Sequence, residues 1–399
     1  MVGIVILALC YVLSHFYRSF LAVLSPLLSA ELAMTPDELS TALGAWFVAF
    51  ALSQFLVGIL LDRFGPRRTN ALMFGVLAGG GAVLFATADN GLVVLIAMIL
   101  LGIGCAPVLM ASLYIFKLRF DPSRFATLMS VFIAVGLLGN ILGSSPLAWA
   151  LDVLGWRNTV LGLAGVTILL AVLAWYVVAD PEVERRDGEQ RGGYLSLIKL
   201  REMWWILPLV ATNYAVSGGL RGIWAGPYLD DIHGMTAAGI GQITFYMALA
   251  LAAGSFCFGP ADRFFNTRKW VVIPGASVGL VALLVWALDP AMSPDRVAVV
   301  LVIIGFCSMS YGVLMAHATA NIPDHLAGRG VTLVNFFNMG GVGVMQWITG
   351  GVYAQSGGAA PIDAYANVLW VYVLTLTAAI GIYMLSRDVK PLVNKLANK

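Results

Sequence analysis

Two stretches of this sequence share one pattern, and the distance between them is about half the length of the chain. Residues 58–68 read Gly-Ile-Leu-Leu-Asp-Arg-Phe-Gly-Pro-Arg-Arg, and residues 259–269 read Gly-Pro-Ala-Asp-Arg-Phe-Phe-Asn-Thr-Arg-Lys. Each stretch follows a long apolar run, and the two lie about 200 residues apart. A second pair, residues 11–18 and 214–221, reads Tyr-x-x-Ser-x-x-x-Arg at nearly the same offset. The repeat predicts a chain built from two related halves.

The composition indicates a membrane protein. The chain is 60% hydrophobic and 11% charged, which excludes an ordinary water-soluble domain. Twelve runs are long enough to cross a bilayer, at 4–28, 41–61, 71–88, 92–116, 125–150, 158–179, 203–229, 237–259, 270–288, 296–320, 330–354 and 365–386. The one long polar break follows the sixth run. We therefore expect a bundle over 1–179, a cytoplasmic linker over 180–202 and a second bundle over 203–399.

The basic residues predict the orientation and single out two arginines. With the N-terminus in the cytoplasm, most of the 23 Lys and Arg fall in cytoplasmic loops. Arg157 and Arg296 fall at the outer edge, and only Arg18 and Arg221 fall inside the runs. We expect a bacterial-type inner membrane, with both termini in the cytoplasm. None of the 21 carboxylates lies deep in a run, so a bound anion is the expected partner of the two buried cations.

The first stretch, 58–68, resembles the signature loop of the major facilitator superfamily, Gly-x-Leu-x-Asp-Arg-x-Gly-x-Arg-Arg. The resemblance implies an all-α membrane fold, with twelve transmembrane helices in two pseudo-symmetric six-helix bundles, and a monomer. It also implies a cytoplasmic gate, in which the glycine at 58 lets helices two and eleven approach. An aspartate would lie at the N-terminus of helix eleven, and arginines would hold the gate closed. The residues that carry over are Gly58, Asp62, Arg63, Gly65, Arg67 and Arg68.

A further resemblance concerns the substrate. One arginine in helix one and its counterpart in helix seven resemble the organophosphate:phosphate antiporters and organic-anion porters, in which two arginines clamp a phosphate. This role carries over only to Arg18 and Arg221, because the helix-two basic residue and the helix-five histidine of that branch have no match here. The expected substrate is a small organic anion, either a phosphate ester or a carboxylate.

Further side chains are candidates for the same site. Tyr11, Ser14 and Arg18 are spaced along one helix face, as are Tyr214, Ser217 and Arg221. Weaker candidates are Trp224, Asn335, Asn338 and Tyr246. The alternatives stay open, since a tyrosine can simply pack and a serine can bond its own helix.

Two histidines, His15 and His317, fall inside the runs and are candidates for proton coupling. His15 precedes Arg18 by three residues, so the two charges would repel until an anion arrives. Each histidine can instead be a neutral, hydrogen-bonded residue of the core.

The sequence favours secondary transport by alternating access, by symport or antiport. No catalytic constellation, metal-ligand spacing or cofactor motif is present, and we expect no nucleic-acid partner. The expected partners are the anion, membrane lipid, and a co-transported proton or exchanged anion. The alternatives are a proton-driven exporter of drugs or metabolites, a lipid-headgroup flippase and a transporter-like sensor. The glycines of the fifth and eleventh runs favour close helix packing.

Overall fold

The computed structural model describes residues 2–119, 128, 131–179, 197, 200–320, 322, 327–356 and 360–390, without the side chains of Asp62, Lys117, Leu118 and 327–329. Most of the predicted linker, 180–202, therefore lies outside the described residues. The chain divides into two compact units. The first comprises Met1–Arg186, Gly222–Asp230 and Gly234–Phe245, and the second comprises Asp187–Arg221, Asp231–His233 and Tyr246–Lys399.

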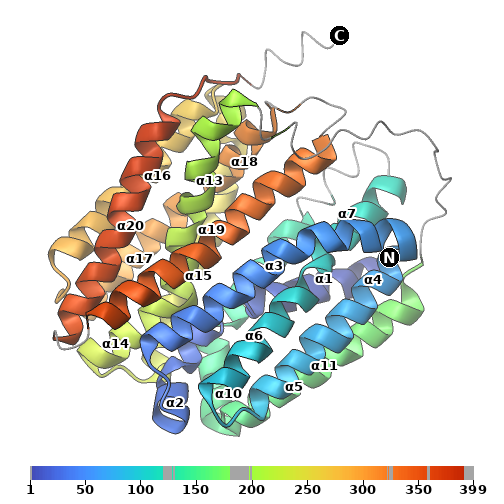
Figure 1. Ribbon diagram of the computed structural model, residues 1–399, viewed down its shortest axis with the longest axis horizontal. Helices are drawn as coiled ribbons and strands as arrows, with labels where there is room; N and C mark the ends of the chain where they lie inside the picture. Colours follow the sequence, from blue (N-terminus) through green and yellow to red (C-terminus); the bar gives the residue numbers. More distant parts are fainter. Residues whose placement is uncertain are drawn as a thin grey trace. The chain divides into compact units, whose positions relative to one another are not determined.

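Every regular element of the described residues is a helix, as the sequence predicts (Figure 1). Up to residue 177 the elements are α1 (Val2–Phe16), α2 (Leu21–Leu32), α3 (Pro36–Phe64), α4 (Pro66–Leu72), η1 (Met73–Gly79), α5 (Gly80–Ala86), α6 (Gly91–Cys105), α7 (Pro107–Arg119), α9 (Leu138–Leu142), α10 (Ser145–Leu154) and α11 (Trp156–Val177). Within the first unit, α6 packs against both α3 and α5.

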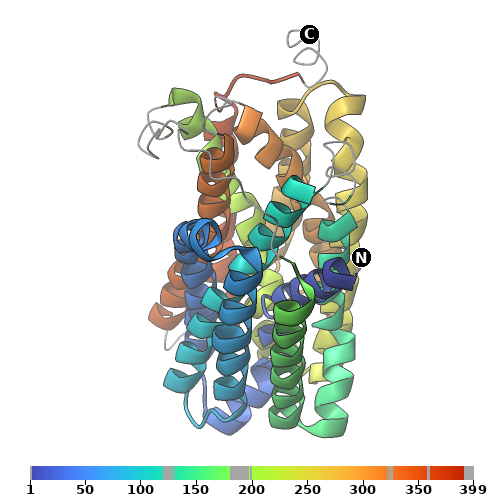
Figure 2. The same ribbon diagram turned by 90° about the vertical axis from the view of Figure 1, so that its right-hand side faces the viewer.

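The later elements are α13 (Arg201–Gly219), η2 (Leu220–Trp224), α14 (Ala225–His233), α15 (Ala237–Phe264), α16 (Lys269–Leu288), α17 (Pro294–Ser308), α18 (Tyr311–Ala320), α19 (Ala327–Gln355) and α20 (Pro361–Tyr383). Within the second unit, α16 packs against both α17 and α20, and α13 packs against α19 (Figures 1 and 2).

Local sequence signals define where several helices begin. Thr35 and Glu38 form a capping box at the start of α3, and the Thr35 backbone N–H donates to Glu38 Oε2 at 3.1 Å. Asn90 caps α6 by accepting a hydrogen bond from the Val93 backbone N–H at 3.0 Å. Pro294 and Pro361 occupy first-turn positions in α17 and α20, where their missing N–H groups cost nothing.

The helices meet the requirements of a membrane protein. Among the residues that the structure describes, eight helices are long and apolar enough to cross a bilayer, and ten if each of two bent pairs counts as one span. The bent pairs are Val2–Phe16 with Leu21–Leu32, at 51°, and Val131–Leu142 with Ser145–Leu154, at 44°. The two other predicted runs, 203–229 and 330–354, coincide with α13–η2–α14 and α19. These helices carry more polar residues and are not among the ten.

Glycines permit close packing where the sequence predicts it. A Cβ atom added at Gly139 would lie 1.9 Å from the Val12 carbonyl oxygen, so the fifth run touches the backbone of α1. In the second unit, a Cβ atom added at Gly341 of α19 would lie 2.2 Å from the Ala211 carbonyl oxygen of α13. Neither contact leaves room for a larger residue.

Candidate functional site

Arg18 lies where the first span breaks. Between α1 and α2 the backbone tightens, with Arg18 N–H donating to the His15 carbonyl at 3.3 Å and Ser19 N–H donating to the Phe16 carbonyl at 3.0 Å. Tyr17 in the same turn hydrogen-bonds Thr167 of α11 at 2.9 Å, which anchors the break to a neighbouring helix. The sequence predicts a continuous helix face through Arg18. That prediction is wrong at the arginine itself, because the chain bends there.

A pair of aromatic rings on α3 faces the Arg18 guanidinium. Its Cζ atom lies 4.9 Å from the centre of the Phe50 ring and 5.5 Å from the centre of the Trp46 ring. The two rings are stacked on each other at 5.2 Å. Cation–π attraction of this kind stabilises a cation in an apolar setting. Neither residue was predicted from the sequence, although their spacing of four places them on one face of the second run.

The Arg18 side chain is 5% exposed, and its Nε is buried with no hydrogen-bond partner in the described part of the chain. The Trp46 and Phe50 rings stabilise the cation without neutralising it, and neither ring offers a conventional acceptor to the Nε–H group. A buried donor without a partner is costly. An acceptor on a bound molecule would remove that cost.

The other candidates of the first repeat lie around the same turn. Tyr11 stacks on Phe132 at 5.0 Å and meets the His15 ring edge-on at 4.6 Å. Tyr11, Ser14 and His15 are all buried. A Cβ atom added at Gly136 would lie 2.3 Å from the Tyr11 ring, so this glycine makes room for the tyrosine.

Arg221 also lies at a departure from α-helical geometry. It belongs to η2, a π-helical segment between α13 and α14, and its side chain is 3% exposed. π-Helical turns inside α-helices are frequent at functional sites. Each copy of the repeated Tyr-x-x-Ser-x-x-x-Arg string thus places its arginine at a local irregularity, which no sequence signal had indicated.

Two residues of the second repeat, Ser217 and Tyr214, contact groups within their own unit. The Ser217 hydroxyl donates to the Tyr214 carbonyl at 3.2 Å, which is the backbone-bonding alternative considered from the sequence. The Tyr214 ring contacts the Tyr311 ring at 5.3 Å. Neither observation assigns a binding role.

The remaining polar candidates differ in burial. Asn338 of α19 is 1% exposed, and neither its amide oxygen nor its amide nitrogen has a hydrogen-bond partner among the described residues. Asn335 is half-buried, Trp224 is buried, and Tyr246 is 43% exposed. Of these four, Asn338 most resembles a residue that awaits a polar ligand.

His317 is held at both ring nitrogens. Nδ1 lies 2.6 Å from the Tyr383 hydroxyl and Nε2 lies 2.9 Å from the Arg387 carbonyl oxygen. A neutral imidazole that donates from Nε2 and accepts at Nδ1 satisfies both contacts. These two contacts join α18 to the end of α20, which gives His317 a structural role. Of the two histidines predicted to couple protons, we therefore keep His15 as the candidate.

The predicted gate loop connects α3 to α4. Gly65 has a φ of 81°, a backbone conformation that strongly favours glycine, and its N–H donates to the Leu61 carbonyl at 3.0 Å. Arg63 and Arg68 are exposed, and Arg67 lies over the Trp175 ring at 6.0 Å. The Asp62 side chain lies outside the described residues. A Cβ atom added at Gly58 would meet no atom within 4 Å, so its approach to helix eleven stays a prediction.

In the second copy of the loop, Asn266 replaces the glycine and adopts a φ of 49°, which asparagine tolerates better than most residues. Arg268 Nε pairs with Asp262 at 3.3 Å, and its Nη1 donates to the Ala316 carbonyl at 3.1 Å. The second loop is therefore tied to helices of its own unit.

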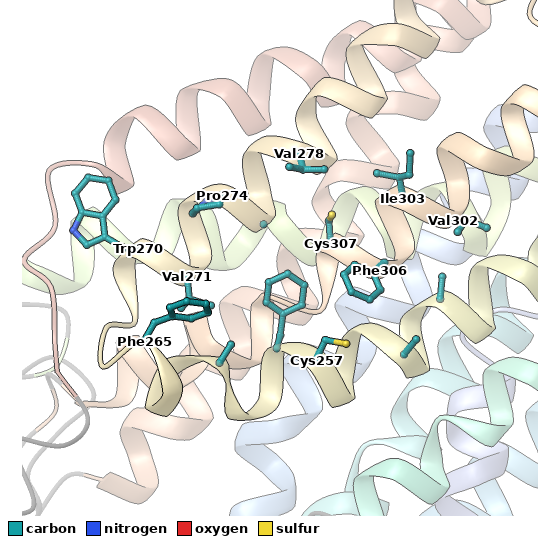
Figure 3. A pocket seen from close by; sticks show the side chains of 15 residues that line it. Cys257, Phe265, Trp270, Val271, Pro274, Val278, Val302, Ile303, Phe306 and Cys307 are labelled. Carbon is teal, nitrogen blue, oxygen red and sulfur yellow. The ribbon is translucent and has the colours of Figure 1, made fainter.

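A cavity of about 790 Å³ in the second unit does not suit an anion. It opens between α15, α16 and α17, and no charged side chain lines it (Figure 3). Residues such as Phe265, Trp270 and Phe306 make the lining apolar. Such a surface fits hydrocarbon better than a charged ligand.

A multi-pass helical membrane protein with buried arginines at helix irregularities has the architecture of a secondary transporter. The family model of the Major Facilitator Superfamily matches residues 7–346, and the chain belongs to that superfamily. The superfamily assignment predicted from the 58–68 stretch is confirmed, and the gate role of this loop stays a prediction. The narrower resemblance to the organophosphate:phosphate antiporter branch stays a prediction.

Individual relatives agree with this assignment. The chain is 25% identical over 340 residues to the probable L-galactonate transporter of Escherichia coli (strain K12), with 78% of this chain and 67% of that protein covered. It is 21% identical to the probable sulfoacetate transporter of Cupriavidus necator, with 62% of this chain and 61% of that protein covered. Among solved structures, a bacterial homologue of the human lysosomal transporter Spinster matches with a TM-score of 0.74, at 19% identity and 96% coverage of each chain. The structural match supports the fold alone.

Proposed function

We propose that this protein is a secondary active transporter of a small organic anion, with Arg18 and Arg221 as the cationic groups that bind it. Alternating access of the two halves carries the anion across a bacterial-type inner membrane, with both termini in the cytoplasm. A carboxylate or a phosphate ester suits the planar fork of an arginine.

The observation that supports the proposal most directly is the burial of Arg18 without a hydrogen-bond acceptor for its Nε–H group in the described part of the chain. Arg18 lies at a helix break. No carboxylate falls deep inside any of the predicted spans. A transporter needs a cation that is satisfied only when the substrate is present, because the same group must release the substrate later.

The relatives support the chemical class. One is named for L-galactonate, a sugar acid, and another for sulfoacetate, which carries a carboxylate and a sulfonate. Both compounds are small organic anions with more than one oxygen acceptor. These names favour carboxylates over phosphate esters as the first substrates to test.

The test is a thermal-shift screen of the purified protein against a defined anion panel: L-galactonate, galactarate, D-glucuronate, sulfoacetate, glycerol 3-phosphate and inorganic phosphate, with galactose as the uncharged control. A ligand at a hundredfold excess over its Kd stabilises by about 2.7 kcal/mol. We expect at least one organic anion to stabilise the wild type and galactose to have no effect.

Three variants complete the screen. Arg18→Gln and Arg221→Gln should each lose the shift, whereas Arg296→Gln, at an exposed outer position, should keep it. A panel without any shift for the wild type, or variants that keep the full shift, would contradict the proposal.

A further inference from the structure

The indole N–H group of Trp46 is buried without a hydrogen-bond partner in the described part of the chain. The Trp46 side chain is 0% exposed. Buried tryptophans usually place this N–H against an acceptor, because an unmade hydrogen bond in the interior is costly. Packing alone therefore does not account for a tryptophan here; a phenylalanine would fill the space without the cost.

The unsatisfied indole belongs to the residue that lies beside Arg18. The Arg18 Cζ lies 5.5 Å from the centre of the Trp46 ring, and the Arg18 Nε is itself without a partner in the described part of the chain. An indole N–H and a guanidinium are both donors without any acceptor capacity. They cannot satisfy each other, so only an acceptor supplied from elsewhere can satisfy both.

We propose that the Trp46 indole N–H donates a hydrogen bond to the same anion that Arg18 binds. This inference rests on the proposed function and deepens it by adding a neutral donor to the charged one. The preferred ligand has at least two oxygen acceptors, one for the guanidinium and one for the indole. Because both nitrogens are shielded from bulk water, the bonds form in a low dielectric and are strengthened by it.

Phe50 completes the arrangement by restraining the guanidinium. Its ring stacks against Trp46 at 5.2 Å and lies 4.9 Å from the Arg18 Cζ. The two aromatic residues therefore have different tasks. Phe50 positions the arginine, whereas Trp46 contacts both the arginine and the anion.

The decisive variant is Trp46→Phe, which keeps an aromatic ring and removes the N–H. We expect the Kd of the best-binding anion of the panel to rise about tenfold, as for the loss of one hydrogen bond to a charged group. The matched control is Trp149→Phe on α10, where the side chain is 69% exposed and the Kd should not change.

A second measurement does not depend on the stability of that variant. In protein labelled with ¹⁵N at the indole nitrogens, one of the 11 tryptophan N–H signals should move downfield as the anion saturates the wild type. The same signal should stay in place in Arg18→Gln.

The outcomes separate this inference from the proposed function. If Trp46→Phe binds like the wild type, or no indole signal moves, while Arg18→Gln loses binding, the indole role is wrong and the proposed function stands. If Arg18→Gln binds like the wild type, both are wrong.

Discussion

The guanidinium carbon of Arg18 lies 4.9 Å from the centre of the Phe50 ring, with one residue at a helix break and the other on α3. The ring holds the cation without neutralising it. A carboxylate in the same place would satisfy the arginine permanently and compete with any substrate anion. An aromatic partner leaves the charge available, which is what reversible anion binding requires.

The first prediction concerns this ring. Phe50→Leu keeps an apolar side chain and removes the cation–π contact, which is worth about 0.5–2 kcal/mol. We expect the Kd of the bound anion to rise by roughly threefold to tenfold, with little change in the amount of folded protein. Isothermal titration of the purified variant checks this. Phe256→Leu on α15, 73% exposed, is the matched control, and equal effects of the two substitutions would contradict the assignment.

The second prediction concerns proton coupling. His15 lies three residues before Arg18, and its ring meets the Tyr11 ring at 4.6 Å, so it stays the candidate for proton coupling. We expect His15→Gln to flatten the dependence of anion uptake on pH near neutrality. His317→Gln is the matched control. It should lower the melting temperature, because the Tyr383 hydroxyl and the Arg387 carbonyl lose their hydrogen bonds to the imidazole, but the uptake should keep its dependence on pH. A His15→Gln protein with the wild-type pH profile would remove His15 from the mechanism.

The third prediction tests the packing that positions the first span. A methyl group at Gly139 would lie 1.9 Å from the Val12 carbonyl oxygen and 2.8 Å from the His15 Cβ atom. Gly139→Ala should therefore destabilise the protein by about 1–3 kcal/mol and weaken anion binding. Gly165→Ala in α11, where an added Cβ atom meets nothing within 4 Å, should have no such effect. Melting temperatures in detergent distinguish the two, and equal melting temperatures would refute the close contact.

The fourth prediction concerns the C-terminal end of the second unit. The Asp388 carboxylate accepts hydrogen bonds from the Thr267 hydroxyl at 2.7 Å and from the Arg268 and Lys269 backbone N–H groups at 3.2 and 3.0 Å. Burial alone would raise the pKa of Asp388, but these hydrogen bonds outweigh it and hold the pKa below its usual value. The carboxylate therefore stabilises the fold above its unfolded pKa of about 3.9. That stability is lost as the pH falls through the lower, folded pKa.

Asp388→Asn should lower the melting temperature at pH 7, and the difference from the wild type should shrink as the buffer is acidified. Asp289→Asn, at an exposed position, is the control and should leave the melting temperature unchanged. A difference that grows on acidification would have the wrong sign and would contradict the role of the carboxylate.

Much of the fold could be predicted from the sequence, because membrane-spanning helices are recognised by the length and the hydropathy of their apolar runs. The runs at 41–61 and 92–116 match long apolar helices, and the loop signature identified the superfamily. Gly139 of the fifth run and Gly341 of the eleventh run lie at close helix contacts, as predicted, whereas Gly351 has no neighbour within 4 Å of an added Cβ atom.

The sequence did not indicate the irregularities at the two arginines. The 51° bend beside Arg18 and the π-helical segment around Arg221 lie within strings that read as continuous helix. Helix breaks of this kind depend on tertiary contacts, such as the hydrogen bond between Tyr17 and Thr167 of a distant helix. No local pattern records such a contact.

The aromatic partners of Arg18 escaped prediction for a related reason. A buried cation is expected to pair with a charged group, whereas Trp46 and Phe50 carry no charge. Their spacing of four was a usable signal, but many aromatic residues in apolar runs share it. Only the three-dimensional contact distinguishes them from ordinary core.

The most direct test of the central claim is transport by purified protein in proteoliposomes, with wild type, Arg18→Gln and Arg296→Gln measured side by side for uptake of each anion of the panel. We predict that the wild type and Arg296→Gln accumulate at least one organic anion and leave galactose outside, and that Arg18→Gln stays at the level of protein-free vesicles. Uptake of the same anion by Arg18→Gln at the wild-type rate would show that the buried arginine does not bind the substrate.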